Sequence, residues 1–273
     1  MKAETIMELH GSMFLPGSGL DWCEWNYRLS YLFAEFFNTV TNLPIIVLPL
    51  LGIRLSRNYL SAVNPNVRYV YLLMSFVGIT SAYYHATLSL FGQLLDELCL
   101  LWVTTAGFIV WLPSMTQIPL FIKHRTKPIR ALLTAVTLCA SFLCFVKPSW
   151  NAFFLITLCV PCMVVMIIET KTHSSSEAAT MAFIITSLWG LAVLVWICDR
   201  TMCSFWRTIG FPYLHALWHL ASGAGSYLAI VLFSFFDASS KVPNLKPHIL
   251  RVPHSFPLPL TIPYLFLEAT ATA

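Results

Sequence analysis

The amino-acid sequence predicts an all-α membrane protein with seven transmembrane helices, and two observations support this. The chain is 58% hydrophobic and 10% charged, whereas soluble domains carry about 25% charged residues. Its apolar residues are also gathered into runs of roughly 20, the length that a helix needs to cross about 30 Å of hydrocarbon. We therefore expect one polytopic membrane domain. The net charge of +4 is dispersed along the chain, which argues against nucleic acid as a partner.

Seven apolar runs follow a polar N-terminal segment. They span residues 32–53, 67–87, 93–112, 128–146, 150–169, 178–198 and 211–236. Pro161 is expected to kink the fifth run, because proline removes a helical hydrogen bond. The tail is too rich in proline to form an eighth span. The chain is thereby divided into an N-terminal segment (1–30), a seven-helix domain (31–240) and a tail (241–273).

The distribution of lysine and arginine predicts the orientation. Seven spans place the two termini on opposite sides of the membrane. Of the 16 Lys and Arg residues, eleven fall in the loops on one side and five in those on the other. Cytosolic loops carry an excess of Lys and Arg. The C-terminal tail is therefore predicted to be cytosolic, and the N-terminal segment lumenal.

Five polar side chains lie near the predicted lumenal ends of apolar runs. Ser81 and His85 come at the end of the second run, and Asp96 at the start of the third. His215 and His219 come at the start of the seventh. Ionisable groups inside a bilayer are costly and mark candidate functional sites. Since all five fall in one leaflet, we favour a shared site over separate interfacial or helix-contact roles.

The residue types at these positions indicate a catalytic zinc site. His215 and His219 are four residues apart, so they lie on one helical face, as in the two-histidine motif of many zinc enzymes. A third ligand, His85, would leave a coordination position open for water, as catalytic zinc requires. Asp96 is a suitable general base for that water. Ser81, one turn before His85, could donate a hydrogen bond to an oxyanion.

A second group of oxygen ligands lies in the N-terminal segment. Calcium takes six to eight oxygen ligands. This segment and the start of the first run offer side-chain or backbone oxygens at Asp21, Trp22, Glu24, Asn26 and Glu35. The alternative is an interfacial segment anchored by its tryptophans. Spacing alone favours that alternative, but it leaves Glu35, within an apolar run, unexplained.

Cys23 and Cys203 both fall in predicted lumenal segments. A disulfide is chemically permitted on that side of the membrane. A pair of free thiols is equally compatible with the sequence, so the residues alone leave both states open.

Several motifs together resemble the alkaline ceramidase family. They run in order over about residues 20–240: Asp-Trp-Cys-Glu-x-Asn at 21–26, Ala-Glu-Phe-Phe-Asn-Thr at 34–39, Tyr-x-His-Ala-Thr-Leu-Ser with Gly-Gln-Leu-Leu-Asp-Glu across 83–97, Asp-Arg at 199–200, and Phe-Pro-Tyr-Leu-His-x-x-Trp-His at 211–219. Residues 145–148 and 236–239 are most similar to the Golgi-type member. The tail matches the family poorly.

This resemblance implies an intramembrane enzyme that hydrolyses ceramide to sphingosine and a fatty acid, with calcium stimulation and a neutral-to-alkaline optimum. It implies zinc held by His85, His215 and His219, with Asp96 as base and Ser81 at the oxyanion. It implies calcium held by the N-terminal oxygen ligands and Glu35, and a disulfide between the two lumenal cysteines. The Golgi membrane is the implied location, with the endoplasmic reticulum as the alternative and the active site toward the lumenal leaflet.

Two other classes of protein share part of this pattern. Seven-helix receptors of the adiponectin and progestin type resemble it in the Ser-x-x-x-His, Asp and His-x-x-x-His residues. The Asp-Trp-Cys-Glu-x-Asn stretch and the predicted orientation favour the ceramidase. A proton-coupled transporter could also use buried His and Asp, but the inverted repeats that many transporters show are not visible here.

Overall fold

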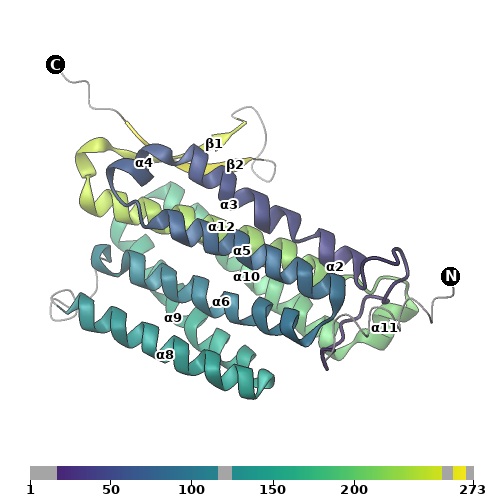
Figure 1. The fold of residues 1–273 in the computed structure, drawn as a ribbon. Helices are drawn as coiled ribbons and strands as arrows, with labels where there is room; N and C mark the ends of the chain where they lie inside the picture. The colour runs from purple at the N-terminus through teal and green to yellow at the C-terminus, as the bar shows by residue number, and fades with distance from the viewer. Residues whose placement is uncertain (1–16, 116–124, 254–260, 269–273) are drawn as a thin grey trace.

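The computed structural model describes residues 17–115, 125–253 and 261–268. The predicted N-terminal segment is therefore seen from residue 17 onward, and the tail in two pieces. The long helices run side by side along one axis (Figure 1). The elements in chain order are α2 (Phe36–Val40), α3 (Leu43–Leu55), α4 (Arg57–Ala62), α5 (Val67–Thr87), α6 (Leu90–Trp111), η1 (Leu112–Ser114), α8 (Thr126–Val146), η2 (Pro148–Trp150), α9 (Asn151–His173), α10 (Ser176–Thr201), α11 (Cys203–Thr208), α12 (Leu214–Lys241), η3 (Pro243–Leu245), β1 (Pro247–Val252) and β2 (Ile262–Leu267).

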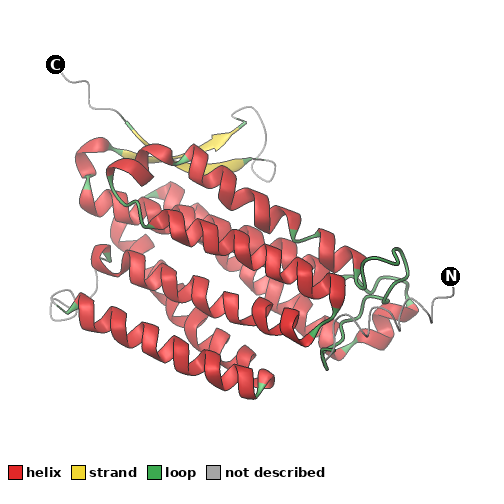
Figure 2. Cartoon of the chain, in the orientation of Figure 1, coloured by secondary structure: helices red, strands yellow, loops and turns green. Residues whose placement is uncertain are grey.

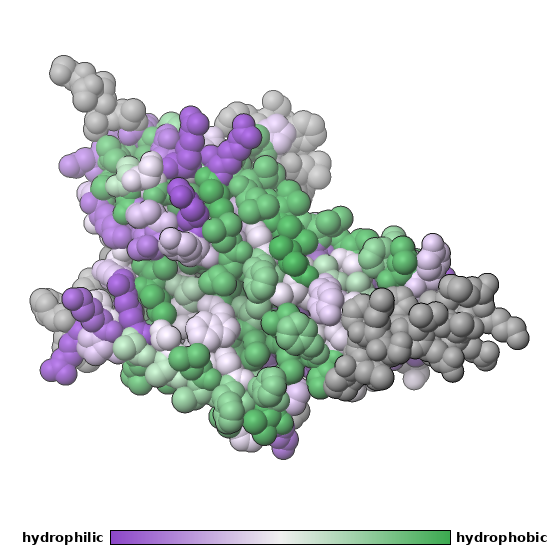
Figure 3. Space-filling view, viewed as in Figure 1, coloured by the Kyte–Doolittle hydropathy of each residue, from purple (hydrophilic) through white to green (hydrophobic). Residues whose placement is uncertain are grey.

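The prediction of an all-α membrane protein is confirmed. Among the described residues, six helical segments are long and apolar enough to cross a membrane; α2 and α3 together form the first of them. Helix α5 has 21 residues, a sufficient length, but it buries several polar side chains. Helix α9 continues through Pro161 rather than ending there. Apolar residues cover the middle of the face shown in Figure 3, where they would meet lipid.

Helices α3, α5 and α12 approach one another closely at two glycines. A Cβ atom on Gly78 of α5 would lie 2.8 Å from the Cγ1 atom of Ile46. A Cβ atom on Gly223 of α12 would lie 2.6 Å from the Cγ1 atom of Ile45. Small residues let helix backbones approach in this way, and membrane helix pairs depend on such packing. The close contact fixes α5 and α12, which carry three histidines, relative to α3.

The end of the bundle where α12 finishes is held by one buried carboxylate. Asp237 accepts hydrogen bonds from Tyr59 (2.7 Å), Asn64 (3.1 Å) and the Ser114 hydroxyl. Lys241, one turn further along α12, lies 2.8 Å from the same carboxylate. A buried charge is tolerated when its lone pairs are satisfied in this way, so this network ties α12 to α4 and η1.

The tail forms an antiparallel hairpin, which the sequence analysis did not predict (Figure 2). Strands β1 and β2 pair with Ile249 opposite Leu265. Both side chains are buried against the bundle. The Tyr227 hydroxyl of α12 donates to the Pro263 carbonyl (2.8 Å), and the Leu265 amide donates to Ser56 (3.2 Å). The tail forms no eighth span in the described residues, but part of it is ordered and packed.

Candidate metal centre

Three histidines converge at the end of the bundle opposite Asp237. His85 lies in the last turn of α5, and His215 and His219 lie in the first two turns of α12. One ligand nitrogen from each ring lies within 4.8 Å of the others. All three side chains are buried. Segments that are far apart in the sequence therefore form one cluster, and its spacing could hold a metal ion.

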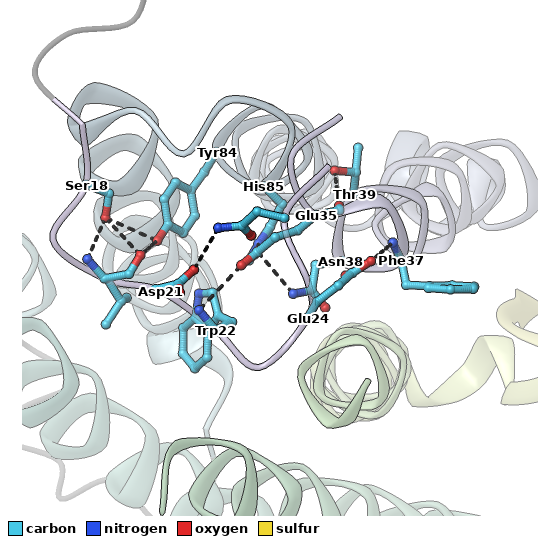
Figure 4. A network of polar contacts seen from close by, with 12 residues as sticks. Ser18, Asp21, Trp22, Glu24, Glu35, Phe37, Asn38, Thr39, Tyr84 and His85 are labelled. Atoms are coloured by element: carbon cyan, nitrogen blue, oxygen red, sulfur yellow. Dashed lines mark hydrogen bonds and ion pairs between the residues drawn. The ribbon is translucent and has the colours of Figure 1, made fainter. Parts of the chain in front are cut away.

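The orientation of His85 is fixed by Glu35. The Nδ1 atom of His85 lies 2.6 Å from the Oε2 atom of Glu35 (Figure 4). An Nδ1–H group donating to the carboxylate leaves the lone pair on Nε2, and this Nε2 atom is buried without a partner. A carboxylate behind a ligand histidine is the usual means by which proteins fix the tautomer of a metal-binding imidazole.

His219 is held in the same way by a hydroxyl group. Its Nδ1 atom lies 3.0 Å from the Thr41 Oγ1 atom. The Thr41 hydroxyl donates its own proton to the Phe37 carbonyl (2.7 Å), so its oxygen can accept from an Nδ1–H group of His219. In that tautomer the lone pair lies on Nε2, the nitrogen that a metal ion would use, whereas the Asn42 amide, 3.4 Å from Nδ1, favours the other tautomer.

His215 is positioned by an aromatic ring rather than by a hydrogen bond. The Trp22 ring stacks on it with centroids 3.5 Å apart and an interplanar angle of 17°. The Nδ1 atom of His215 is buried and has no hydrogen-bond partner. Unpaired polar atoms in a buried site are costly. The His85 Nε2 and His215 Nδ1 atoms are both buried without a partner, and His219 lies within reach of the same point. Three imidazoles arranged in this way fit a divalent ion of the zinc type.

Asp96 and Ser81 lie at the same end of the bundle as this cluster. Asp96 is in the second turn of α6, whose first turn is capped by Ser89 accepting from the Gly92 amide (3.0 Å). Ser81 lies one turn before His85 on α5 and is buried. Its hydroxyl interacts with the Asp96 carboxylate. The loop between α5 and α6 thus brings a carboxylate and a hydroxyl to the same end of the bundle as the histidines.

The predicted oxygen ligands of the N-terminal segment have other partners in the structure. Glu24 accepts from the backbone amides of Phe37 (2.7 Å) and Asn38 (2.8 Å), so it caps α2. Asp21 accepts from Asn26 (3.2 Å). Burial raises the pKa of Glu24 to about 7, against the opposing effect of its two backbone hydrogen bonds. A divalent cation nearby would lower that pKa, since it stabilises the ionised carboxylate.

Glu35 lies between the N-terminal segment and the histidines. Besides contacting His85, its carboxylate accepts from the Asn38 side chain (3.1 Å) and from the Trp22 amide (3.4 Å). The sequence analysis grouped Glu35 with the calcium ligands alone. Among the residues that the structure describes, the three histidines are the group of His, Cys, Asp or Glu side chains found with metal-binding spacing.

A disulfide joins Cys23 to Cys203 at the start of α11. The Cys23 amide also donates to Asp199 of α10 (3.2 Å), and its carbonyl accepts from Arg207 (2.9 Å). These contacts hold the segment that contains Trp22 over the start of α12. Figure 1 shows this segment and α11 side by side at the end of the bundle.

Sequence reasoning missed two kinds of site residue. Thr41 and Asn42 contact Nδ1 of His219, but the sequence places them inside an apolar run. Two consecutive polar residues within such a run could have indicated that they face a site. The contact between Asp199 and Cys23 could not be predicted from sequence spacing, because the two residues lie 176 residues apart.

Comparison with known proteins places most of the described chain in one family. A family model described as Ceramidase matches residues 15–265. An alkaline ceramidase of Caenorhabditis elegans is 43% identical over 231 residues, 84% of this chain and 85% of the relative. One of Drosophila melanogaster is 40% identical over 233 residues (85% and 82%). Alkaline ceramidase 1 of Homo sapiens is 32% identical over 227 residues (83% and 86%). The family match contains every residue of the candidate centre.

Proposed function

Because this chain belongs to the alkaline ceramidase family, we propose that it hydrolyses the amide bond of ceramide to give sphingosine and a free fatty acid. The observation that carries this proposal is the buried cluster of His85, His215 and His219 at one end of a bundle of membrane-spanning length. A hydrolase that acts on a lipid needs its reacting groups within reach of the bilayer.

We propose that the three histidines hold zinc. When bound, zinc supplies a Lewis acid that polarises a carbonyl and lowers the pKa of bound water to about 7. The protein's part is to fix the orientation of the ligand imidazoles. Glu35 does this for His85 and Thr41 for His219.

Asp96 and Ser81 are the proposed groups for proton transfer and charge stabilisation. A carboxylate at Asp96 would take a proton from the attacking water and return it to the leaving amine, as a general base and then acid. The Ser81 hydroxyl would donate a hydrogen bond to the oxygen that becomes negative as the carbonyl is attacked. Their mutual interaction keeps both groups close before substrate arrives.

The headgroup of ceramide fits this end of the molecule. Ceramide is uncharged, so it needs no cationic side chain for recognition. The two arginines near the centre are already used: Arg200 donates to the Asp21 carbonyl (3.2 Å) and Arg207 to the Cys23 carbonyl (2.9 Å). The surrounding helices expose apolar side chains, so the two hydrocarbon chains of ceramide would remain in an apolar environment.

We propose further that calcium binds the N-terminal segment and stimulates the activity, and that the activity has a neutral-to-alkaline optimum. The proposed calcium ligands are Asp21, the Trp22 carbonyl, Glu24, Asn26 and Glu35. What supports this is the density of oxygen atoms there and the contact between Glu35 and His85. Calcium chelation would then lower turnover without removing zinc. Unchanged turnover after chelation would make this segment a packing element only.

The Golgi-type subtype, a Golgi location and a lumenal metal centre are also proposals. The excess of Lys and Arg in one set of loops supports the orientation. Figure 3 shows hydrophilic residues gathered toward the end of the molecule where α4 and the start of α8 lie. An epitope in the tail, probed in intact Golgi and endoplasmic reticulum vesicles, tests the location and the orientation. Protection of that epitope from added protease would show the opposite orientation.

Release of fatty acid from ceramide by detergent-purified protein tests the main proposal. His219→Ala is expected to abolish turnover and to lower the zinc content to near zero. His248→Ala, which changes an exposed side chain of strand β1, is the matched control and should keep both turnover and zinc. Protein that holds zinc but does not hydrolyse ceramide at any pH or chain length would instead support a receptor of the adiponectin and progestin type.

A further inference from the structure

One carboxylate near the metal centre has an oxygen without a partner. Glu97 follows Asp96 on α6. Its Oε1 atom accepts a hydrogen bond from Gln93 (2.9 Å). Its Oε2 atom is shielded from solvent and makes no hydrogen bond. An unpaired carboxylate oxygen at such a depth costs free energy, and one in a native structure calls for a specific explanation.

The position of Glu97 is set by a chain of hydrogen bonds that reaches the N-terminal segment. The Gln93 amide donates to Glu97, and its oxygen accepts from the Ser18 hydroxyl (2.7 Å). Ser18 lies 3.3 Å from the hydroxyl of Tyr84, which donates to the Leu20 carbonyl (3.0 Å). Figure 4 shows Ser18 and Tyr84 together beside His85. This chain fixes one oxygen of the carboxylate and leaves the other free.

Glu97 is also adjacent to the reacting groups. It directly follows Asp96, and the Tyr84 that supports it directly precedes His85. Consecutive Cα atoms are about 3.8 Å apart, although their side chains point about 100° apart around the helix. The two carboxylates are nevertheless close enough to interact electrostatically. The face of α6 that carries Glu97 lies near Cys144 of α8, inside the bundle of spanning helices.

We propose that the free oxygen of Glu97 accepts a hydrogen bond from a hydroxyl group of the sphingoid base, and so selects substrates that carry that hydroxyl. This inference rests on the proposed ceramide hydrolysis. Ceramide offers two hydroxyls close to its amide, and a hydroxyl can donate a short hydrogen bond to a carboxylate oxygen. The oxygen that is unpaired in the free protein would be satisfied when substrate binds. A site that must hydrogen-bond a hydroxyl rejects the analogue that lacks it.

The test compares three substrates in the full-length purified protein: ceramide, its 1-deoxy analogue and its 3-deoxy analogue. The wild-type protein is expected to prefer ceramide over one analogue by about 10- to 100-fold in kcat/KM, the range for a hydrogen bond to a charged group. Glu97→Gln should lower kcat/KM for ceramide to the level of that analogue, and should leave turnover of that analogue unchanged. The analogue whose discrimination disappears identifies the hydroxyl.

Controls separate this role from a structural one. Glu177→Gln removes an exposed carboxylate at the other end of the bundle and should change none of the three rates. If Glu97→Gln does not fold, Glu97→Asp keeps the charge, and its shorter side chain should reduce the discrimination in part. A loss shared equally by all three substrates, or no loss for any, would overturn the proposal; so would a wild-type protein that does not discriminate among them.

Failure of the broader function gives a different result. Wild-type protein that hydrolyses none of the three substrates would overturn ceramide hydrolysis, and this inference with it. Wild-type protein that hydrolyses ceramide, with a Glu97→Gln variant of identical selectivity, would overturn the role of Glu97 alone.

Discussion

Glu35 is the residue through which the N-terminal segment contacts the histidine cluster. One oxygen of its carboxylate lies 2.6 Å from His85, and the other accepts from the Trp22 amide. A change in this segment would therefore alter the basicity and orientation of a proposed metal ligand directly, without any movement of the helices.

Glu35→Ala is expected to weaken two properties together. Loss of the hydrogen bond to His85 should lower zinc affinity by about 10- to 100-fold, as for other residues that support metal ligands, and the calcium response should diminish. Zinc retention against a chelator measures the first effect, and activity against calcium concentration the second. Glu24→Gln, which has no contact with the histidines, should affect the calcium response alone. Full zinc affinity in Glu35→Ala would contradict the supporting role.

Asp96→Asn is expected to lower turnover of ceramide by about 10²- to 10⁴-fold, the range for loss of a general base. The amide has nearly the same shape but cannot take a proton from water. Zinc content should stay at the wild-type level, because Asp96 is not among the three converging ligands. A variant with wild-type turnover would remove Asp96 from the mechanism.

Helix α5 packs against α3 through a close backbone contact at Gly78. Gly78 lies one turn before the end that carries Ser81 and His85, and its Cα faces the backbone of α3. The relative position of these two helices therefore determines whether Glu35, which immediately precedes α2, reaches His85.

Gly78→Ala is expected to destabilise the protein by about 1–3 kcal/mol, since overpacking of a tight contact costs that much. The added methyl group would force α3 and α5 apart and should also lower turnover. Gly190→Ala in α10 is the matched control, because nothing lies within 4 Å of its added Cβ. Thermal unfolding in detergent compares the two variants. Equal unfolding temperatures would show that α3 can move to accommodate the added methyl group.

The sequence predicted elements where hydrophobicity decides the structure, and it failed where side-chain partners decide it. The spans were visible because apolar runs of membrane length have few alternative structures. The hairpin of β1 and β2 was not visible, because its burial comes from α12 and α3, not from a pattern of its own. The converging histidines could be inferred from spacing and sidedness. The pairing of Glu35 with His85 could not, because the Glu35 oxygens suit either calcium or an imidazole.

At the scale of the whole molecule, one covalent bond joins the segment before the first helix to the segment before the last. The Cys23–Cys203 disulfide holds Trp22 where it stacks on His215. The architecture around the candidate centre therefore depends on a bond between two segments that are 180 residues apart in the sequence.

Reduction of this disulfide is expected to lower both stability and turnover. Loss of a native disulfide costs about 2–4 kcal/mol in typical cases, and here it would also release the ring that covers His215. Cys23→Ser should reproduce the effect of a reductant and make the protein insensitive to further reduction. Cys139→Ser, at an exposed free thiol, is the control. A reduced protein with unchanged unfolding temperature and activity would show that the hydrogen bonds of Asp199 and Arg207 suffice.

The two anchored ends of α12 have a consequence for its length. The first two turns carry His215 and His219. The last two turns carry Asp237, whose carboxylate contacts four side chains, three of them outside α12. Each residue turns an α-helix by about 100° and advances it by about 1.5 Å. Inserting or deleting one residue between these ends would rotate one anchor away from its partners, whichever residue was chosen. The number of residues between the two anchored ends of α12 is therefore fixed by the partners at both ends of the bundle.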